Sequence, residues 1–183
     1  YIMKKRISTI ILTVLISLCF GQFNDPMYFN NVYNQNTWSI CLSILEYNNA
    51  YYGLGITSDS IFYYKSIVFS RINLSGELEI WNEFRRNFSD NYPGHGSSFH
   101  YIGNEQFVDG GSADPKGLLS KIQETGDTIW TRLFSSKLGS KMIIDHCRIL
   151  PDKGFICTGQ DDYVDAYSDV VLLRTDSLGN ELW

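Results

Sequence analysis

Four aspartates stand close together in the segment QDDYVDAYSD, and their carboxylates are the groups in this chain best suited to hold a cation. They are Asp161, Asp162, Asp165 and Asp169, in a stretch expected to form a loop between two strands. Acidic loops that supply several oxygen ligands bind Ca²⁺. The segment lacks the alternating ligands and the central glycine of an EF-hand loop, and the corresponding loops upstream are less acidic. A calcium loop is therefore one hypothesis, and a solvated acidic loop is the one we favour.

Two cysteines are placed for a cross-link. Cys147 and Cys157 flank the turn PDKG, so they could face each other across a hairpin. A disulfide depends on the register of the two strands, because a shift of one residue moves a side chain to the other face of the sheet. The alternative, which we favour from the sequence, is a pair of small, buried, apolar side chains without a covalent bond. The sequence does not decide between them.

The sequence shows no set of residues that would make an active site. The histidines His95, His100 and His146 have no cysteine or acidic partner at the spacing of a metal site. No G-x-S-x-G elbow, phosphate-binding loop or H-E-x-x-H motif occurs. We therefore expect no catalytic residue, no bound metal and no cofactor.

A repeat of about fifty residues organises the chain and must position all of these groups. One anchor is a turn glycine followed by a tryptophan, in NLSGELEIW, QETGDTIW and DSLGNELW. The other anchor lies upstream, at the end of the segments YYGLG, FVDGG and FICTG. The turn glycines are Gly76, Gly126 and Gly179, the upstream glycines are Gly55, Gly111 and Gly159, and the tryptophans are Trp81, Trp130 and Trp183.

Each repeat predicts four short strands joined by tight turns. Asn73 and Asp176 open the last turn with a side chain that bonds the backbone two residues on, and the closing glycine adopts positive φ at little cost. Gln123 opens the middle turn, and its longer side chain suits this role poorly. The first repeat has one extra residue between Gly76 and Trp81, which we interpret as a β-bulge. The tryptophans are expected to fill the space between neighbouring sheets, since burying one ring removes about 150–250 Å² from water.

A basic residue also recurs ahead of each turn glycine, at Arg71, Lys121 and Arg174. These residues could form a ring of cations for an anionic glycan. Recurrence in every repeat favours a structural role instead, with the stem packed along the sheet and the charge at the surface or paired.

Antiparallel strands in units of about fifty residues indicate a β-propeller, in which each unit covers the faces of its neighbours. We predict an all-β chain that forms a partial β-propeller of about three four-stranded antiparallel blades, at about 39–84, 97–134 and 145–183. Because a ring has typically about 4–8 blades, we expect an N-terminal fragment of a longer ring, completed by remaining blades of the same chain. Residues 22–38 are too polar for a blade and form a lead-in, or a strand that completes the last blade.

Residues 1–21 have the pattern of a secretory signal peptide. Lys4, Lys5 and Arg6 precede an apolar run that ends before Gly21. The run is shorter than the roughly 20 residues that span a bilayer, so we expect cleavage and no remaining membrane span. Loss of these basic residues makes the chain more acidic than its net charge of −5. This balance argues against nucleic-acid binding and fits a secreted or cell-surface protein.

The third repeat, DKGFICTG followed by DVVLLRTDSLGNELW, resembles the tandem propeller repeats of secreted and cell-surface bacterial proteins. In that family a DGG-[FY]-[IV]-x-x-G hairpin precedes D-x-[WY]-[LV]-[IL]-[KR]-x-[DN]-x-x-G-[ND]-x-x-W. The resemblance covers about residues 39–183, although the first repeat lacks the Gly-Gly hairpin and the second has Gly117 at a strand position. Many members carry a C-terminal sorting domain read by the type IX secretion machinery, and none is visible here. The resemblance implies a location and an architecture, and no reaction.

We therefore expect a noncatalytic module that binds an extracellular glycan or protein, or acts as a scaffold, at the cell surface. Two alternatives are a propeller enzyme acting on extracellular polysaccharide and a purely structural adhesin or stalk module. The enzyme would need a pair of carboxylates converging on the central opening. The expected innermost-strand positions Ile40, Phe99 and His146 supply none.

Overall fold

A computed structural model describes Tyr33 and residues 38–58, 65–84, 90–94, 98–137, 140–162 and 168–183. The expected signal peptide, most of the expected lead-in, His95 and Asp165 lie outside these residues. The described part consists of β-strands and the turns between them, which confirms the all-β prediction. It contains no helix long and apolar enough to cross a bilayer.

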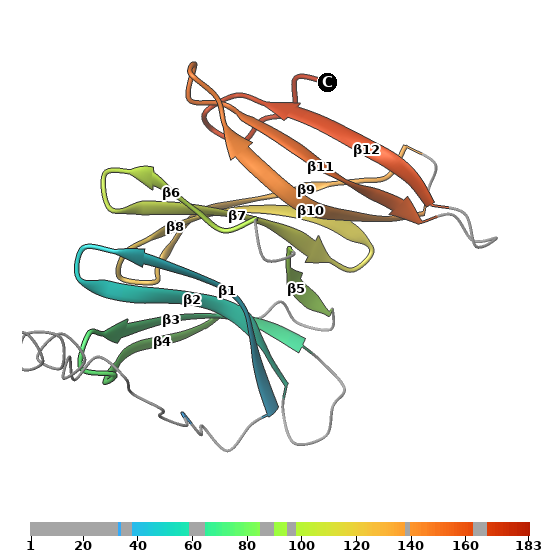
Figure 1. Ribbon diagram of the computed structural model, residues 1–183. Helices are drawn as coiled ribbons and strands as arrows, with labels where there is room; N and C mark the ends of the chain where they lie inside the picture. Colours follow the sequence, from blue (N-terminus) through green and yellow to red (C-terminus); the bar gives the residue numbers. More distant parts are fainter. Residues whose placement is uncertain are drawn as a thin grey trace, which may run out of the picture. The chain divides into compact units, whose positions relative to one another are not determined.

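The strands form three antiparallel sheets, labelled in Figure 1. The first sheet is a meander of β1 (Trp38–Tyr47), β2 (Ala50–Ser58), β3 (Lys65–Asn73) and β4 (Leu78–Phe84). The second sheet contains β5 (Asn91–Pro93), β6 (His100–Gly103), β7 (Gln106–Ala113), β8 (Lys116–Gln123) and β9 (Thr128–Phe134). The third sheet contains β10 (Lys141–Ile149), β11 (Phe155–Asp162) and β12 (Ser168–Thr175).

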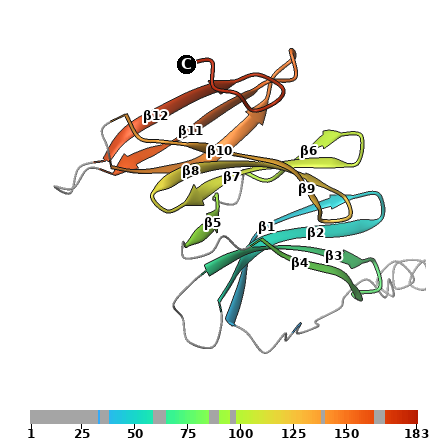
Figure 2. The ribbon, with the colours of Figure 1, turned by 180° about the vertical axis from the view of Figure 1, so that it is seen from behind.

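The first strand of the second sheet is made of two pieces, β5 and β6. Both pair with the same edge of β7, β5 near its end and β6 near its start (Figures 1 and 2). Together they take the place that β1 holds beside β2 and β10 holds beside β11. The second sheet therefore begins at Asn91, earlier than the predicted residue 97, and the third begins at Lys141.

The third sheet differs from the predicted four-stranded unit. After β12, Thr175 forms a single bridge with Glu181, and the amide of Arg174 donates to the carbonyl oxygen of Trp183 at 2.8 Å. Within the described residues, β12 has no strand beside the rest of this edge. β3 and β8, which hold the same place in the other two sheets, are each paired along their length with β4 or β9.

Short turns join β1 to β2 and β6 to β7. Asn48 and Asn49 have φ of 48° and 58°, and Asn104 and Glu105 have φ of 53° and 57°. Two successive residues at positive φ match the right-handed twist of the flanking strands, and asparagine enters this region more easily than most residues. The polar sequences YNNA and GNEQ are therefore tight hairpin turns.

Two apolar cores hold the sheets together, one on each side of the second sheet. The first core joins the first and second sheets and contains Tyr52, Phe69 and Phe107. The second core joins the second and third sheets and contains Val108, Leu119 and Phe155. Phe107 and Val108 are neighbours in β7 but face different cores, as side chains in a strand alternate. Coverage on both faces explains why β8 is apolar at successive positions.

Candidate functional site

The upstream glycines of the repeat share one structural environment. Each lies opposite a disruption in the first strand of its sheet: a register shift after Cys41 in β1, the gap between β5 and β6, and a register shift after Ile144 in β10. At this glycine a Cβ atom would overlap a carbonyl oxygen of that first strand: Gly55 with that of Ile40, Gly111 with that of Tyr92, and Gly159 with that of Ile143. The glycine is therefore required by the close approach of two backbones.

The turn glycines also share one backbone conformation. Gly76, Gly126 and Gly179 have φ of 82°, 84° and 78°. In the first turn, Asn73 Oδ1 accepts from the amides of Ser75 (3.0 Å) and Glu77 (2.9 Å). In the third, Asp176 Oδ1 accepts from the amides of Leu178 (2.9 Å) and Asn180 (2.8 Å).

Hydrogen bonds from the side-chain amide and the amide N–H of Asn180 hold the pKa of Asp176 below its usual value. In the middle turn, the main chain of Gln123 makes the closing bonds, to Gly126 and Asp127 at 2.8 Å. The same two main-chain bonds close the turns at Asn73 and Asp176, so the three turns share one backbone form.

The tryptophans are not equivalent, which corrects the sequence alignment. Trp130 pairs with Lys121, but the residue that pairs with Arg71 is Ile80, and Trp81 lies one position further on, opposite Ser70. A register shift occurs in both β3–β4 and β8–β9, so a bulge does not absorb the extra residue of the first repeat. Ile80 packs on the first core as Trp130 packs on the second. Because neighbouring residues face opposite sides of a strand, Trp81 faces away from the first core.

The acidic segment does not assemble a cation site among its described residues. Asp161 is 6% exposed, and its two carboxylate oxygens accept from Ser140 Oγ and from Ser136 Oγ at 2.7 Å. Asp169 lies directly opposite Asp161 in β12 and is exposed. The side chains of Asp162 and Asp165 lie outside the described part. No group of three or more histidine, cysteine or acidic residues with metal-binding geometry occurs in the residues that the structure describes.

The first and second sheets are joined by a polar contact that includes a recurring basic residue. Arg71 Nη1 lies 2.9 Å from Glu79 Oε2, and its Nη2 lies 3.7 Å from Glu124 Oε1 in the turn of the second sheet. The Tyr52 hydroxyl donates to the same Glu124 oxygen. Burial and this carboxylate raise the pKa of Tyr52. Arg174 of the third sheet pairs with Asp152, so these two cations are used in structural contacts.

Asp109 is the most buried carboxyl group described, and sequence reasoning did not single it out. It is 1% exposed, and its Oδ1 accepts from Ser98 Oγ at 2.6 Å. Its Oδ2 is buried without a hydrogen-bond partner among the described residues. Burial raises its pKa well above the usual range. It lines a cleft of about 370 Å³ between the first and second sheets, together with Asn91, Ser120 and Thr131.

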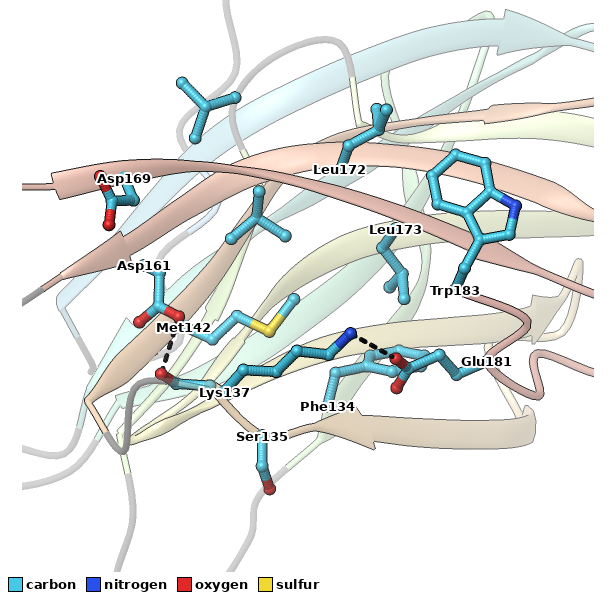
Figure 3. A pocket seen from close by; sticks show the side chains of 13 residues that line it. Phe134, Ser135, Lys137, Met142, Asp161, Asp169, Leu172, Leu173, Glu181 and Trp183 are labelled. Atoms are coloured by element: carbon cyan, nitrogen blue, oxygen red, sulfur yellow. Dashed lines mark hydrogen bonds and ion pairs between the residues drawn. The ribbon is translucent and has the colours of Figure 1, made fainter.

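A second pocket, of about 240 Å³, follows the open edge of β12. Its walls include the core residues Phe134, Met142 and Leu173 (Figure 3). Lys137 extends along it toward Glu181, with Nζ 3.7 Å from Oε1 (Figure 3). The pocket therefore combines an apolar wall, a charged rim and a strand edge.

The direction in which the main-chain groups of β12 point can be derived from one hydrogen bond. Arg174 bonds toward Trp183, and successive residues in a strand point their amides to opposite sides. Leu172 and Val170 therefore direct their amide and carbonyl groups to the same open side as Arg174. Their side chains are 54% and 89% exposed. Among the described residues, residues 181–183 are the ones that pair with this edge of β12.

The described residues thus form an all-β arrangement of successive antiparallel sheets. No protein-family model matches the chain, and no curated protein matches it.

Proposed function

We propose that this chain is an exported, noncatalytic β-propeller module that binds or scaffolds at the cell surface. The observation that carries the proposal is the repetition of antiparallel sheets that pack on one another through corresponding surfaces. We propose that a further strand of the same ring lies beside β12, next to the pocket lined by Phe134, Met142 and Leu173.

Repeated contacts between the sheets support the propeller arrangement. The turn glycine Gly126 of the second sheet packs against Phe69 and Asn82 of the first. In the same way, Gly179 of the third sheet packs against Trp130 and Arg132 of the second. Successive sheets therefore meet through corresponding surfaces, and such repeats stack head to tail.

Head-to-tail stacking leaves one apolar face uncovered on each outer sheet. On the third sheet Val170 and Leu172 are exposed, and on the first sheet Ile44, which lies opposite Gly53 on the face away from the first core, is 66% exposed. We propose that further blades of the same ring cover these faces, because contiguous apolar surface of this kind marks an interaction site.

The proposed occupant of the β12 edge is an antiparallel strand patterned like β4 and β9. Those strands end in Phe84 and Phe134, which lie opposite Ile67 and Gly117. Val170 holds the same position in β12, since Val171 pairs with Gly159 as Leu118 pairs with Gly111. A strand at this edge would cover Val170 and direct alternate side chains toward the pocket.

A peptide with the sequence of residues 127–136, which contains β9, tests the proposal. We expect it to bind the full chain, and we expect Leu172→Pro to weaken binding at least about tenfold, because proline removes an edge donor. Leu178→Ala, in an exposed turn, is the matched control and should bind as the unchanged chain does. Equal binding of a scrambled peptide, or no effect of Leu172→Pro, would contradict the proposal.

Export is supported by the basic and apolar pattern of residues 1–21. Expression of the chain with its own leader in an exporting bacterial host should yield protein that begins at Gln22. Protein that retains residues 1–21 and stays in the cytoplasm would contradict export, without bearing on the strand-edge test.

A further inference from the structure

We propose that Cys147 and Cys157 form an intramolecular disulfide that links β10 to β11, made by exchange with a disulfide oxidant while the chain folds. The proposal rests on the proposed function only for the exported location, where such oxidants act.

The register of β10 and β11 places the two cysteines directly opposite each other. The shift in this ladder lies further along, between Ile144 and His146, so the pairing from the turn to the cysteines is regular. The two strands are therefore paired in a register that permits the cross-link.

Cys147 and Cys157 form a non-hydrogen-bonded pair, the kind of antiparallel pair in which the two Cα atoms lie closer together. At the turn, the amide of Leu150 donates to the carbonyl oxygen of Gly154 at 2.8 Å, which makes this a hydrogen-bonded pair. Alternation along the ladder then makes Ile149–Phe155 a non-bonded pair, Arg148–Ile156 a bonded pair and Cys147–Cys157 a non-bonded pair.

The hydrogen bonds between β11 and β12 also indicate that Cys147–Cys157 is a non-bonded pair. Arg174 bonds toward Trp183, so Leu173 bonds toward Cys157, and Cys157 directs its main-chain groups to β12 and away from β10. Cα atoms of a non-bonded pair lie about 4.5 Å apart, within the roughly 4.4–6.8 Å that a disulfide spans.

Both thiols point into the same core. Cys147 and Cys157 are each 1% exposed and belong to the cluster between the second and third sheets. In the reduced form Cys147 Sγ donates to the carbonyl oxygen of Ser98 at 2.9 Å. Formation of the disulfide removes this weak bond, and it keeps both sulfur atoms within the apolar cluster.

The reaction balances as a thiol–disulfide exchange. A thiolate of one cysteine attacks the oxidant, R–S–S–R, to form a mixed disulfide and release one R–SH. The second cysteine displaces the other R–SH, so both protein thiols lose their hydrogens and the oxidant is reduced to two thiols.

The exchange should take place during folding, because the folded structure hinders it. Burial raises the pKa of Cys147, and it raises the pKa of Cys157 to about 12. The attacking thiolate is therefore scarce once the third sheet has packed on the second. Cys41 is exposed and provides an internal control thiol.

Peptide mapping of the full chain tests the inference directly. The chain is refolded either with a mixture of oxidised and reduced glutathione or with dithiothreitol, then alkylated and digested with trypsin without reduction. Cleavage after Arg148 and Lys153 separates the cysteines, so the disulfide joins the peptide of residues 142–148 to that of residues 154–174. We expect this joined pair from the glutathione sample and separate alkylated peptides from the dithiothreitol sample.

Separate peptides from the glutathione sample, or a link from either peptide to Cys41, would overturn the inference. The same map of unreduced protein from an exporting host gives an answer that does not depend on refolding in vitro. Cys41→Ser should leave the joined pair unchanged. Binding of the β9 peptide is measured separately, so a failure of the disulfide and a failure of the proposed function are distinguishable.

Discussion

The indole of Trp130 lies edge-on against the ring of Phe155, with the two ring centroids 6.0 Å apart. Trp130 belongs to β9 of the second sheet and Phe155 to β11 of the third, so this contact joins two successive repeats. Gly179 of the third sheet packs on the same indole. The tryptophan of the repeat therefore acts between sheets, and Ile80 does so in the first repeat.

The first prediction separates Ile80 from Trp81. Trp130→Ala should lower the free energy of unfolding by about 3 kcal/mol and Ile80→Ala by about 2 kcal/mol, because both remove side chains packed on a core. Trp81→Ala should cost less than about 1 kcal/mol, since Trp81 faces away from that core. Urea denaturation measures all three. A larger loss from Trp81→Ala than from Ile80→Ala would show that the sequence alignment of Trp81 is correct.

The second prediction concerns the close approach at Gly159. Gly159→Ala should destabilise the chain by about 3 kcal/mol, because the added methyl group meets the carbonyl oxygen of Ile143. Gly103→Ala is the matched control: Gly103 has φ of 93° but open space around it, so its cost should be about 1 kcal/mol. Similar losses of stability for the two variants in urea denaturation would mean that the repeated glycine is required by backbone conformation and not by steric overlap.

The third prediction uses the difference between two turns. Asn73→Ala should lower the free energy of unfolding by about 1 kcal/mol, because Asn73 Oδ1 accepts two amide hydrogen bonds. Gln123→Asn should raise it by about 0.5 kcal/mol by supplying the same bonds to a turn of the same backbone form. Thermal and urea unfolding of both variants provide the measurement. A loss of stability in Gln123→Asn would contradict the proposed role of the turn-opening side chain.

The fourth prediction concerns pH. Burial raises the pKa of Asp109, so the folded chain favours the protonated acid. Its contribution to stability is complete below the usual aspartate pKa of about 4 and is lost as pH rises through the folded-state pKa. Asp109→Asn should therefore be more stable than the unchanged chain at pH 7, and the difference should vanish as pH falls below about 4. A difference that is constant with pH would show that Asp109 does not titrate in this way.

The repeat and the all-β fold could be predicted because they depend on local chemistry. Gly76, Gly126 and Gly179 mark turns that need positive φ, and the alternation of apolar residues marks strands. The upstream glycines were also found, but their cause was not. The register shift opposite Gly55 or Gly159, in the first strand of the sheet, arises from the pairing of two strands, and no local sequence pattern predicts it.

The parts that sequence reasoning missed depend on tertiary contacts. β5 contains Pro93 and spans only Asn91–Pro93, so it gives almost no strand signal. Asp109 stands in the segment FVDGG, which the sequence singles out only for its glycine, and the burial of its carboxyl group depends on how β7 packs between two sheets. Trp81 was aligned by residue type, whereas register is fixed by hydrogen bonding along the whole ladder.

Residue-resolved hydrogen exchange tests the central claim, that successive sheets are equivalent and that a strand patterned like β9 pairs with the edge of β12. The amides of Val170 and Leu172 should exchange fast in the free chain, whereas those of Gly117 and Leu119, at the same positions in β8, should exchange slowly. Addition of the β9 peptide should slow Val170 and Leu172 selectively. Slow exchange of these two amides in the free monomer, or no protection by the peptide, would contradict the account.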